Sequence, residues 1–379
     1  MRFLNTTSIQ FEEVADSELS QAENRYAILS HGWGRAEDEI SYEDMISSTD
    51  LSRRKGFAKI KEFCSLASLL GYRYGWVDTC CINKANSSEL AEAINSMYMW
   101  YGFSTLCIVY LEDVPRNRFE DSEWFDRGWT LQELIAPKAV SFFDQHWEPL
   151  GTKLELLESL SQKTGVPSDV LGNIADPSTC SVAQRMSWAA QRVTSRIEDR
   201  AYNLLGLFDI NMPTIYGERE KAFLRLQQHI VQKSKDESLF AWALNTSSDA
   251  PRAYFSVFAS TPSAFRDCSN IVQTPGSACF SENNGELSIS LRIRQYSPGI
   301  FRVLLHCTRK ANPDSKFFIT ISQTFGDETF VRVRDLENIG EGLTNILSGR
   351  EVIIRFPVDP KTPPVTTFFG FWLRTLQPP

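Results

Sequence analysis

The class of fold can be read from nine residues, Tyr26-Ala27-Ile28-Leu29-Ser30-His31-Gly32-Trp33-Gly34. The first five form an apolar run of strand length, and polar and glycine residues follow it. From Lys55 to Leu70 apolar side chains recur every three or four positions, which predicts a helix, and Tyr74 to Asp78 predicts a second strand. Strands that alternate with helices are typical of a parallel sheet with helices on both faces.

The same alternation continues toward residue 151. A helix, a strand and another strand are expected at residues 86–101, 105–111 and 139–143. Asn86 and Glu89 have the spacing of a capping box at the start of this helix. Before the last strand, Asp126 is expected to cap a short helix that ends before Pro137. Residues 1–151 are therefore expected to form one α/β domain.

Two further zones follow this domain. Residues 152–243 carry apolar side chains at helical spacing in three segments and are expected to be a helical segment. In residues 244–379 the period changes, because Leu287, Ile289, Leu291 and Ile293 alternate with polar residues after an Asn-Asn-Gly turn at 283–285. This zone predicts an antiparallel β domain, interpreted as a sandwich.

Charge and apolar content exclude several classes of partner. The whole chain has a net charge of −8, and residues 1–150 hold 14 basic and 24 acidic side chains. Because a basic stripe is missing, no nucleic-acid partner is expected. The apolar runs are all shorter than the ~18 residues of a membrane helix, and the N-terminus lacks the apolar region of a secretory signal, so a cytoplasmic protein without a membrane span is expected.

The spacing of the histidines and cysteines does not favour a metal site or a disulfide. Four histidines and eight cysteines are present, and none of the cysteines forms a C-x-x-C pair. Reduced thiols and the absence of a metal site are therefore expected. The motifs G-x-G-x-x-G after a strand, G-x-x-x-x-G-K-[ST], G-x-S-x-G and H-E-x-x-H are all missing from the sequence.

Four ordered blocks resemble the fungal heterokaryon-incompatibility (HET) domain. They are Tyr26-Ala-Ile-Leu-Ser-His-Gly-Trp-Gly34, Gly75-Trp-Val-Asp-Thr-Cys-Cys-Ile-Asn-Lys84, Glu89-Leu-Ala-Glu-Ala-Ile-Asn-Ser-Met97 and Arg127-Gly-Trp-Thr-Leu-Gln-Glu-Leu-Ile-Ala-Pro137. Residues 186–190, 198–202 and 212–217 are similar to the stretch that commonly follows such domains. The resemblance implies a cytoplasmic effector of fungal non-self recognition and regulated cell death. Lys84 departs from the family pattern and could add a cation near a pocket or only decorate a loop.

The first domain also resembles, more loosely, Toll/interleukin-receptor (TIR) domains. These have a flavodoxin-like sheet, and some cleave the nicotinamide–ribose bond of NAD with a single glutamate. The segment from Arg127 to Leu134 is similar to the TIR helix in which a tryptophan precedes that glutamate. By this resemblance Glu133 is the catalytic carboxylate, and NAD is a substrate rather than a cofactor.

The residues themselves are compatible with such a site. Trp129 and Glu133 are one helical turn apart and share a face. The cleft outside the carboxyl ends of the strands is the expected ligand site of an open α/β sheet. The candidate substrate-binding residues around that cleft are Ser30, His31, Gly32, Trp33, Asp78, Arg127 and Trp129. A carboxylate there could stabilise the oxocarbenium-like state of N-glycosidic cleavage, and an indole could stack on a ring of NAD.

Other interpretations of these residues stay open. Asp78 and His31 could contact a ligand or only fix a loop, and Arg127 could grip a phosphate or pair with Asp126 or Glu123. The chain as a whole could be an NAD glycohydrolase, a self-associating adaptor without activity, or a nucleotide sensor without turnover. Self-association on activation and an unidentified protein partner of the C-terminal region are expected in addition. No cofactor is expected, and the later zones are interpreted as regulatory because no chemistry is evident in them.

Overall fold

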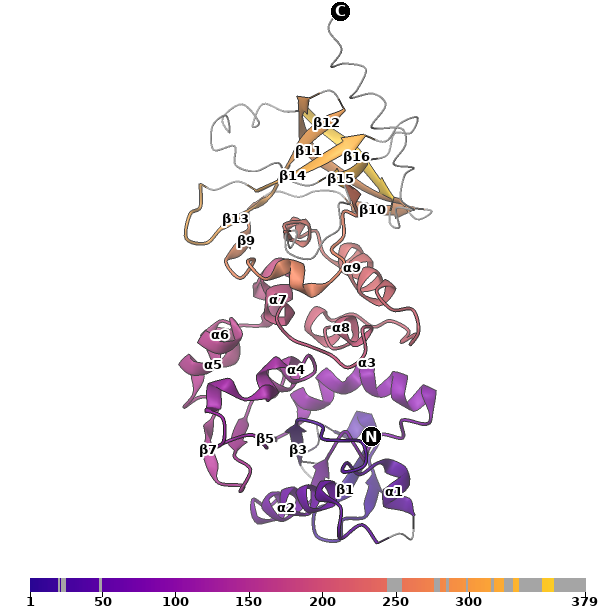
Figure 1. Cartoon of the computed structure of the whole chain (residues 1–379), viewed down its shortest axis with the longest axis vertical. Coiled ribbons are helices and arrows are strands. Elements are labelled where there is room, and N and C mark those ends of the chain that lie inside the picture. The colour runs from indigo at the N-terminus through magenta and orange to yellow at the C-terminus, as the bar shows by residue number, and fades with distance from the viewer. Residues whose placement is uncertain are drawn as a thin grey trace, which may run out of the picture. The chain divides into compact units, whose positions relative to one another are not determined.

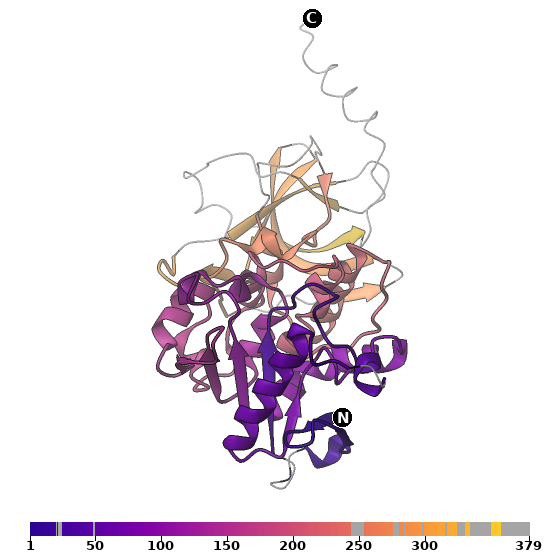
Figure 2. The same ribbon diagram turned by 60° about the horizontal axis from the view of Figure 1, so that its bottom comes forward.

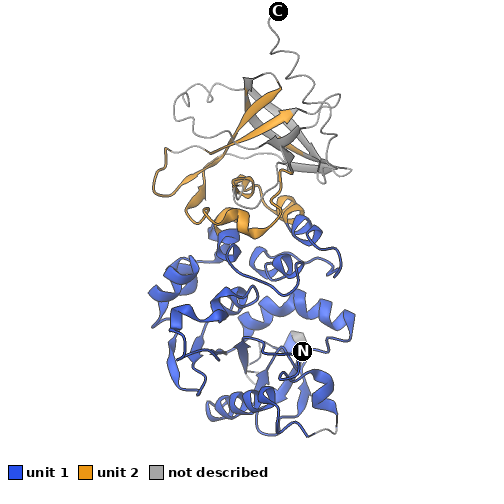
Figure 3. Ribbon diagram, viewed as in Figure 1, with its two compact units in different colours: residues 1–180, 185–226 blue, residues 181–184, 227–379 orange. Residues whose placement is uncertain are grey.

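The computed structural model describes residues 1–19, 21, 25–47, 50–243, 254–275, 280–283, 286–297, 299–314, 317–323, 330–333 and 350–357. The chain divides into two compact units (Figure 3). Unit 1 comprises residues 1–180 and 185–226, and unit 2 comprises residues 181–184 and 227–379. The domain boundaries expected near residues 151 and 243 stay predictions.

Unit 1 is built on a seven-stranded sheet whose order is β2-β1-β4-β3-β5-β6-β7. Its parallel centre consists of β4 (Tyr74–Trp76), β3 (Tyr26–His31), β5 (Leu106–Tyr110) and β6 (Val140–Phe143). In chain order these four strands lie 2-1-3-4, which is the order of flavodoxin-like doubly wound sheets. The α/β fold expected from the sequence, with strands at these positions, is confirmed.

The edges of this sheet are antiparallel and were not predicted. β1 (Arg2–Asn5) pairs with β4 and with β2 (Phe11–Glu13), and β7 (Pro149–Thr152) pairs with β6. These strands have three or four residues each, and β7 contains a proline and a glycine. Such short edge segments carry too little apolar periodicity to be recognised in the sequence.

Helices cover both faces of the sheet. α2 (Lys55–Leu69) lies on one face, and α3 (Ser87–Phe103) and α4 (Thr130–Ile135) lie on the other (Figure 1). In the view of Figure 2, α2 lies in front of the strands. A further short helix, α1 (Tyr42–Ile46), begins at a capping box on Ser41. Because β3 lies between two strands and two helix layers, all six of its residues are buried.

Two expected helix caps differ from the structure. Asp126 ends the 3-10 helix η4 (Glu123–Asp126), and Trp129 occupies the N-cap position of α4 without a side-chain hydrogen bond. The Asn86 side chain does cap α3, but Glu89 accepts a hydrogen bond from the Asn83 amide instead of completing a capping box. Local spacing predicted where each helix lies and could not show which polar group each cap would meet.

The rest of unit 1 is helical, as expected. It contains α5 (Leu157–Thr164), α6 (Ser168–Leu171) and α8 (Asp199–Tyr202), with parts of α7 (Val182–Ala189) and α9 (Lys221–Lys233). α8 is shorter than the helix expected from Glu198 to Phe208, because the 3-10 helix η6 (Gly206–Phe208) forms its second half. A Cβ on Gly206 would lie only 2.0 Å from the Cβ of Tyr98 in α3, so this turn needs a glycine.

Unit 2 contains the antiparallel strands expected in the C-terminal zone. Its main sheet has the order β10-β11-β12-β14-β15-β8, and β16 also pairs with β11. The strands are β8 (Tyr254–Phe255), β10 (Phe280–Asn283), β11 (Glu286–Ser297), β12 (Ile300–Leu305), β14 (Phe317–Gln323), β15 (Phe330–Val333) and β16 (Arg350–Pro357). A second, two-stranded sheet pairs β9 (Ile271–Gln273) with β13 (Cys307–Arg309). The sandwich stays a prediction, and residues 284 and 285 of the expected turn lie outside the described residues.

Seven of the eight cysteines belong to the described residues, and all seven are free thiols. Six of them are buried and Cys180 is half-buried, whereas Cys279 lies outside the described part of the chain. Within the described residues no helix is both long enough and apolar enough to span a membrane.

Candidate functional site

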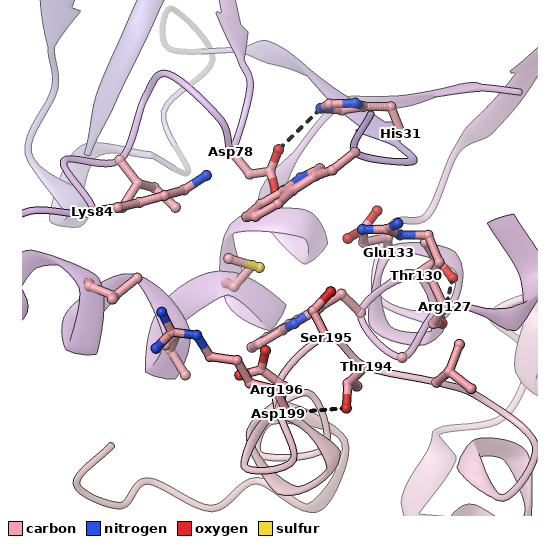
Figure 4. A pocket seen from close by; sticks show the side chains of 18 of the residues that line it. His31, Asp78, Lys84, Arg127, Thr130, Glu133, Thr194, Ser195, Arg196 and Asp199 are labelled. Carbon is pink, nitrogen blue, oxygen red and sulfur yellow. Dashed lines mark hydrogen bonds and ion pairs between the residues drawn. The ribbon is translucent and has the colours of Figure 1, made fainter. Parts of the chain in front are cut away.

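Unit 1 contains a cavity of about 400 Å³ beside the carboxyl ends of β3 and β4 (Figure 4). Its polar wall comes from the segments that follow these two strands, from the start of α4, and from the segment before α8. Helix α3 contributes an apolar wall through Leu90, Ile94 and Met97. The charged and aromatic side chains that line the cavity are His31, Trp33, Asp78, Lys84, Arg127, Trp129, Glu133, Arg196, Asp199 and Tyr216.

Glu133 belongs to α4, and the residue is 5% exposed. The Ser30 hydroxyl donates a hydrogen bond of 2.5 Å to Glu133 Oε2, and the Trp124 indole N–H donates one of 2.9 Å to Ser30 Oγ. Burial, and then the nearby charge of Asp78, raise the pKa of Glu133 to about 8, although Ser30 and Arg127 act in the opposite direction. In most molecules the Glu133 side chain is therefore a neutral acid at pH 7.

His31 and Asp78 form a second polar group in the cavity wall. His31 Nε2 lies 3.2 Å from Asp78 Oδ1 (Figure 4). On the other side of the ring, His31 Nδ1 lies 2.8 Å from the Lys59 ammonium. His31 Nδ1 also lies 3.1 Å from the Gly32 carbonyl oxygen, so the ring contacts a donor and an acceptor on this side. Burial opposes the charge of Asp78, but the contacts with His31, the Lys84 charge and the 2.8 Å bond from the Trp33 indole hold its pKa below the ordinary value.

Three cations line the same cavity. Lys84 lies 3.7 Å above the centre of the Trp33 ring, and the Arg196 guanidinium lies 4.4 Å above the centre of the Tyr216 ring. The charge of Arg127 is near enough to the Glu133 carboxyl to oppose part of the rise in its pKa. Within the described part of the chain, no carboxylate lies within 4.0 Å of any of these three charged groups. The cavity is therefore not negative, although the first 150 residues carry a strong excess of acidic side chains.

The segment at 193–199 closes the cavity against the start of α4. The Gly128 amide donates a hydrogen bond of 2.8 Å to the Val193 carbonyl. A Cβ on Gly128 would lie 2.2 Å from Asn203 Nδ2 and 2.5 Å from Thr194 Cγ2, so this close approach requires a glycine. Asp199 then meets the Tyr216 hydroxyl at 2.9 Å and the Trp129 indole, while burial raises its pKa.

Residues 26–118 match the family described as Heterokaryon incompatibility protein (HET). The chain is also 44% identical over 229 residues to Vegetative incompatibility protein HET-E-1 of Podospora anserina. This chain carries a HET domain. The matched part covers 57% of this chain and 16% of HET-E-1, so the chain spans about a sixth of that relative's length. Residues 221–298 match a domain of unknown function, DUF8212, and no solved structure matches the chain.

The cavity brings together most of the residues proposed from the sequence. Five of the candidate binding residues line it together with Glu133, namely His31, Trp33, Asp78, Arg127 and Trp129. Ser30 is fully buried behind Glu133 and contacts its carboxyl instead of lining the cavity. Gly32 is not part of the wall, and a Cβ placed on it would lie 3.9 Å from Arg127 Cδ. The roles of these residues in binding or catalysis stay predictions.

The cavity also uses residues that sequence reasoning missed, because it assigned no chemistry to the zones after residue 151. Thr194, Ser195, Arg196, Asp199 and Tyr216 all line the cavity, although they lie more than 70 residues beyond the end of that match at residue 118. A signal for two of them was present, since Asp199 and Tyr216 lie within blocks at 198–202 and 212–217 that accompany HET domains. Lys84 was noted as a departure from the family pattern, and it lines the cavity.

Proposed function

We propose that this chain acts in heterokaryon incompatibility and that its HET domain cleaves the nicotinamide–ribose bond of NAD. The name of the relative HET-E-1 supports the first part. The observation that carries the second part is the buried Glu133 carboxyl, which lines a cavity together with three cations that no carboxylate pairs among the described residues. Those cations suit the diphosphate of a dinucleotide, and the carboxylate suits the cationic ribose that forms when nicotinamide leaves.

In the proposed reaction, the bond between the ribose anomeric carbon and the nicotinamide nitrogen breaks first. Its electron pair goes to nicotinamide, which leaves as a neutral base, and positive charge develops on the sugar. Ionised Glu133 stabilises this charge and accepts hydrogen bonds from the ribose hydroxyls. Water then forms the new bond to the anomeric carbon and releases a proton, which gives ADP-ribose. Attack by a ring nitrogen of the adenine would give the cyclic product instead.

The protonation state of Glu133 determines the expected pH dependence. The carboxylate is the active form, and its pKa in the free protein is raised to about 8. We therefore expect kcat/KM for NAD to increase about tenfold per pH unit below pH 7 and to level off above pH 8. A profile that is flat from pH 6 to 9 would exclude Glu133 as the titrating group.

The deciding experiment measures NAD consumption by the full chain at several protein concentrations, because the protein is expected to self-associate on activation. Glu133→Gln keeps the shape of the side chain and the acceptor for Ser30 but removes the charge, so we expect turnover to fall by at least about 100-fold. Glu92→Gln, on the exposed surface of α3, is the matched control and should retain full turnover. Equal turnover of wild type and Glu133→Gln would refute the catalytic assignment.

One observation favours a second candidate function. A carboxyl that is largely neutral at pH 7 can bind a nucleotide without cleaving it, as a sensor would. The sensor alternative predicts saturable binding of NAD and no turnover at any pH between 6 and 9 or at any protein concentration. The glycohydrolase proposal predicts turnover that increases with pH over the same range.

A further inference from the structure

The cavity has two charged ends. Figure 4 shows Lys84 and Arg196 on one side of the cavity and Arg127 with Glu133 on the other side. The first pair comes from segments far apart in the sequence, one after β4 and the other before α8. A ligand that spans the cavity would thus meet two cations at the end opposite the buried carboxyl.

These two cations are held in place without being neutralised. Each lies over an aromatic ring, Lys84 over Trp33 at 3.7 Å and Arg196 over Tyr216 at 4.4 Å. An aromatic face attracts a cation but leaves most of its N–H groups available to a stronger acceptor. Lys59, by contrast, bonds to the carboxylate of Glu39 at 2.9 Å.

The nearby carboxylates are already engaged with other groups. Asp78 accepts a hydrogen bond from the Trp33 indole and faces His31, and Asp199 accepts hydrogen bonds from Tyr216 and Trp129. Consequently neither carboxylate has an oxygen within 4.0 Å of a charged nitrogen of Lys84 or Arg196. The two cations therefore remain available for an anion that enters the cavity.

We propose that Lys84 and Arg196 bind the diphosphate of a nucleotide at the end of the cavity opposite Glu133. Residues 193–216 are then part of the binding site and not a separate regulatory element. A diphosphate matches two cations that approach from different segments, and a guanidinium can donate two parallel hydrogen bonds to one phosphate. That the nucleotide is a dinucleotide rests on the proposed function. The assignment of Lys84 and Arg196 to its phosphates rests on the cavity itself.

The test uses the full chain and calorimetric titration with ADP, which has a diphosphate but no nicotinamide bond to cleave. Adenosine, AMP and inorganic pyrophosphate are titrated beside it, so that the contributions of base and phosphates are separated. We expect Lys84→Gln and Arg196→Gln each to weaken ADP binding about tenfold or more, as for the loss of one charge-assisted hydrogen bond. Binding of adenosine should not change.

Two further variants are controls. Arg200→Gln removes an exposed arginine from α8 that does not line the cavity, and it should bind ADP like the wild type. Lys84→Arg keeps the positive charge and should retain most of the affinity. If Arg196→Gln binds ADP as tightly as Arg200→Gln, or if adenosine loses as much affinity as ADP, the proposal is wrong. It is also wrong if pyrophosphate and ADP fail to bind the wild type at millimolar concentration.

Failure of this proposal can be told apart from failure of the glycohydrolase proposal. Glu133→Gln should bind ADP normally, because Glu133 lies at the other end of the cavity. If the wild type never cleaves NAD while ADP binding still depends on Lys84 and Arg196, the phosphate assignment stands and the catalytic one fails. If NAD is cleaved but both variants keep the KM of the wild type, the reverse holds.

Discussion

The carboxyl of Glu133 owes its chemistry to neighbours that are distant in sequence. Ser30 donates to it from the end of β3, Trp124 fixes that hydroxyl from the other side, and Asp78 opposes its ionisation. The motif around Trp129 pointed to Glu133 as a candidate. It could not show that the side chain is buried, because the exposed fraction depends on strands that approach from elsewhere in the chain.

The raised pKa of Glu133 predicts an effect on stability that does not depend on any activity. The folded protein holds this proton up to about pH 8, whereas the unfolded chain releases it near the ordinary value of 4.5. The folded state therefore binds more protons between these two pH values, and stability falls as the pH rises through this window. Glu133→Gln should be more stable than the wild type by about 4–5 kcal/mol at pH 8.5 and nearly equal at pH 4.5.

Urea unfolding of the full chain, followed by tryptophan fluorescence at both pH values, measures this difference. Glu92→Gln again serves as the control, and its stability relative to the wild type should not depend on pH in this way. A Glu133→Gln variant that is less stable than the wild type at pH 8.5 would contradict the assignment of a neutral buried acid.

At the scale of elements, the short helix α4 is held at both ends by groups outside it. Thr130 accepts a hydrogen bond of 2.9 Å from Arg192 at the first turn. The buried Lys153 ammonium donates to the Leu134 carbonyl at 3.3 Å and to the Pro137 carbonyl at 2.5 Å beyond the last turn. Six residues form too little helix to be stable alone, so these contacts position the turn that carries Glu133.

Gly128 offers a test of that positioning. In Gly128→Ala the new methyl group would collide with Asn203 and Thr194, so the segment at 193–196 must move away from α4. We expect a loss of about 1–3 kcal/mol in the free energy of unfolding and a loss of ADP binding. Thermal unfolding and the same titration measure both quantities.

Gly102→Ala is the matched control. Gly102 lies near the end of α3, where a Cβ would make an ordinary contact at 3.7 Å with the Ala136 carbonyl. Alanine is the better helix former, so this change should be neutral or slightly stabilising. If both alanine variants behave alike, the close approach at Gly128 does not hold the cavity together.

The long elements of unit 1 were predictable because their periods are long and regular. The strands at Tyr26 and Leu106 and the helix at Lys55 lie within one or two residues of the expected positions. What the sequence could not predict were pairings that need a distant partner. β1 becomes a strand because β4 presents an open edge, and the cap of α4 is decided by the fold around Trp129.

At the scale of the whole molecule, every residue that lines the cavity belongs to unit 1. A ligand should therefore reduce amide hydrogen exchange only there. With saturating ADP, we expect lower deuterium uptake in peptides that cover residues 78–84, 127–133 and 193–216. Peptides from β11, β12 and β14 in unit 2 should show no change, and protection in these strands would mean that ADP binds in another place.

The sequence placed the catalytic candidate and the binding residues within residues 1–151, and it was incomplete at this scale. Asp199 and Tyr216 are about 65 to 85 residues from Glu133 along the chain, yet they line the same cavity. Local periodicity gives no information on which distant segments of the chain will line the same cavity. Only the spatial return of the chain after α7 brings these side chains beside α4.

The close contact of Gly128 with Thr194 and Asn203 also has a consequence for how such proteins diversify. Suppose that a genetic exchange replaced only residues 26–118 with those of another HET protein. Arg127, Gly128 and residues 193–216 of the recipient would then face loops from the other protein across the cavity. Exchanges that keep the whole cavity together should therefore have their downstream crossover point beyond residue 216. Hybrid junctions inside residues 119–216 should be rare, and they should bring matching changes at positions 128, 194 and 203.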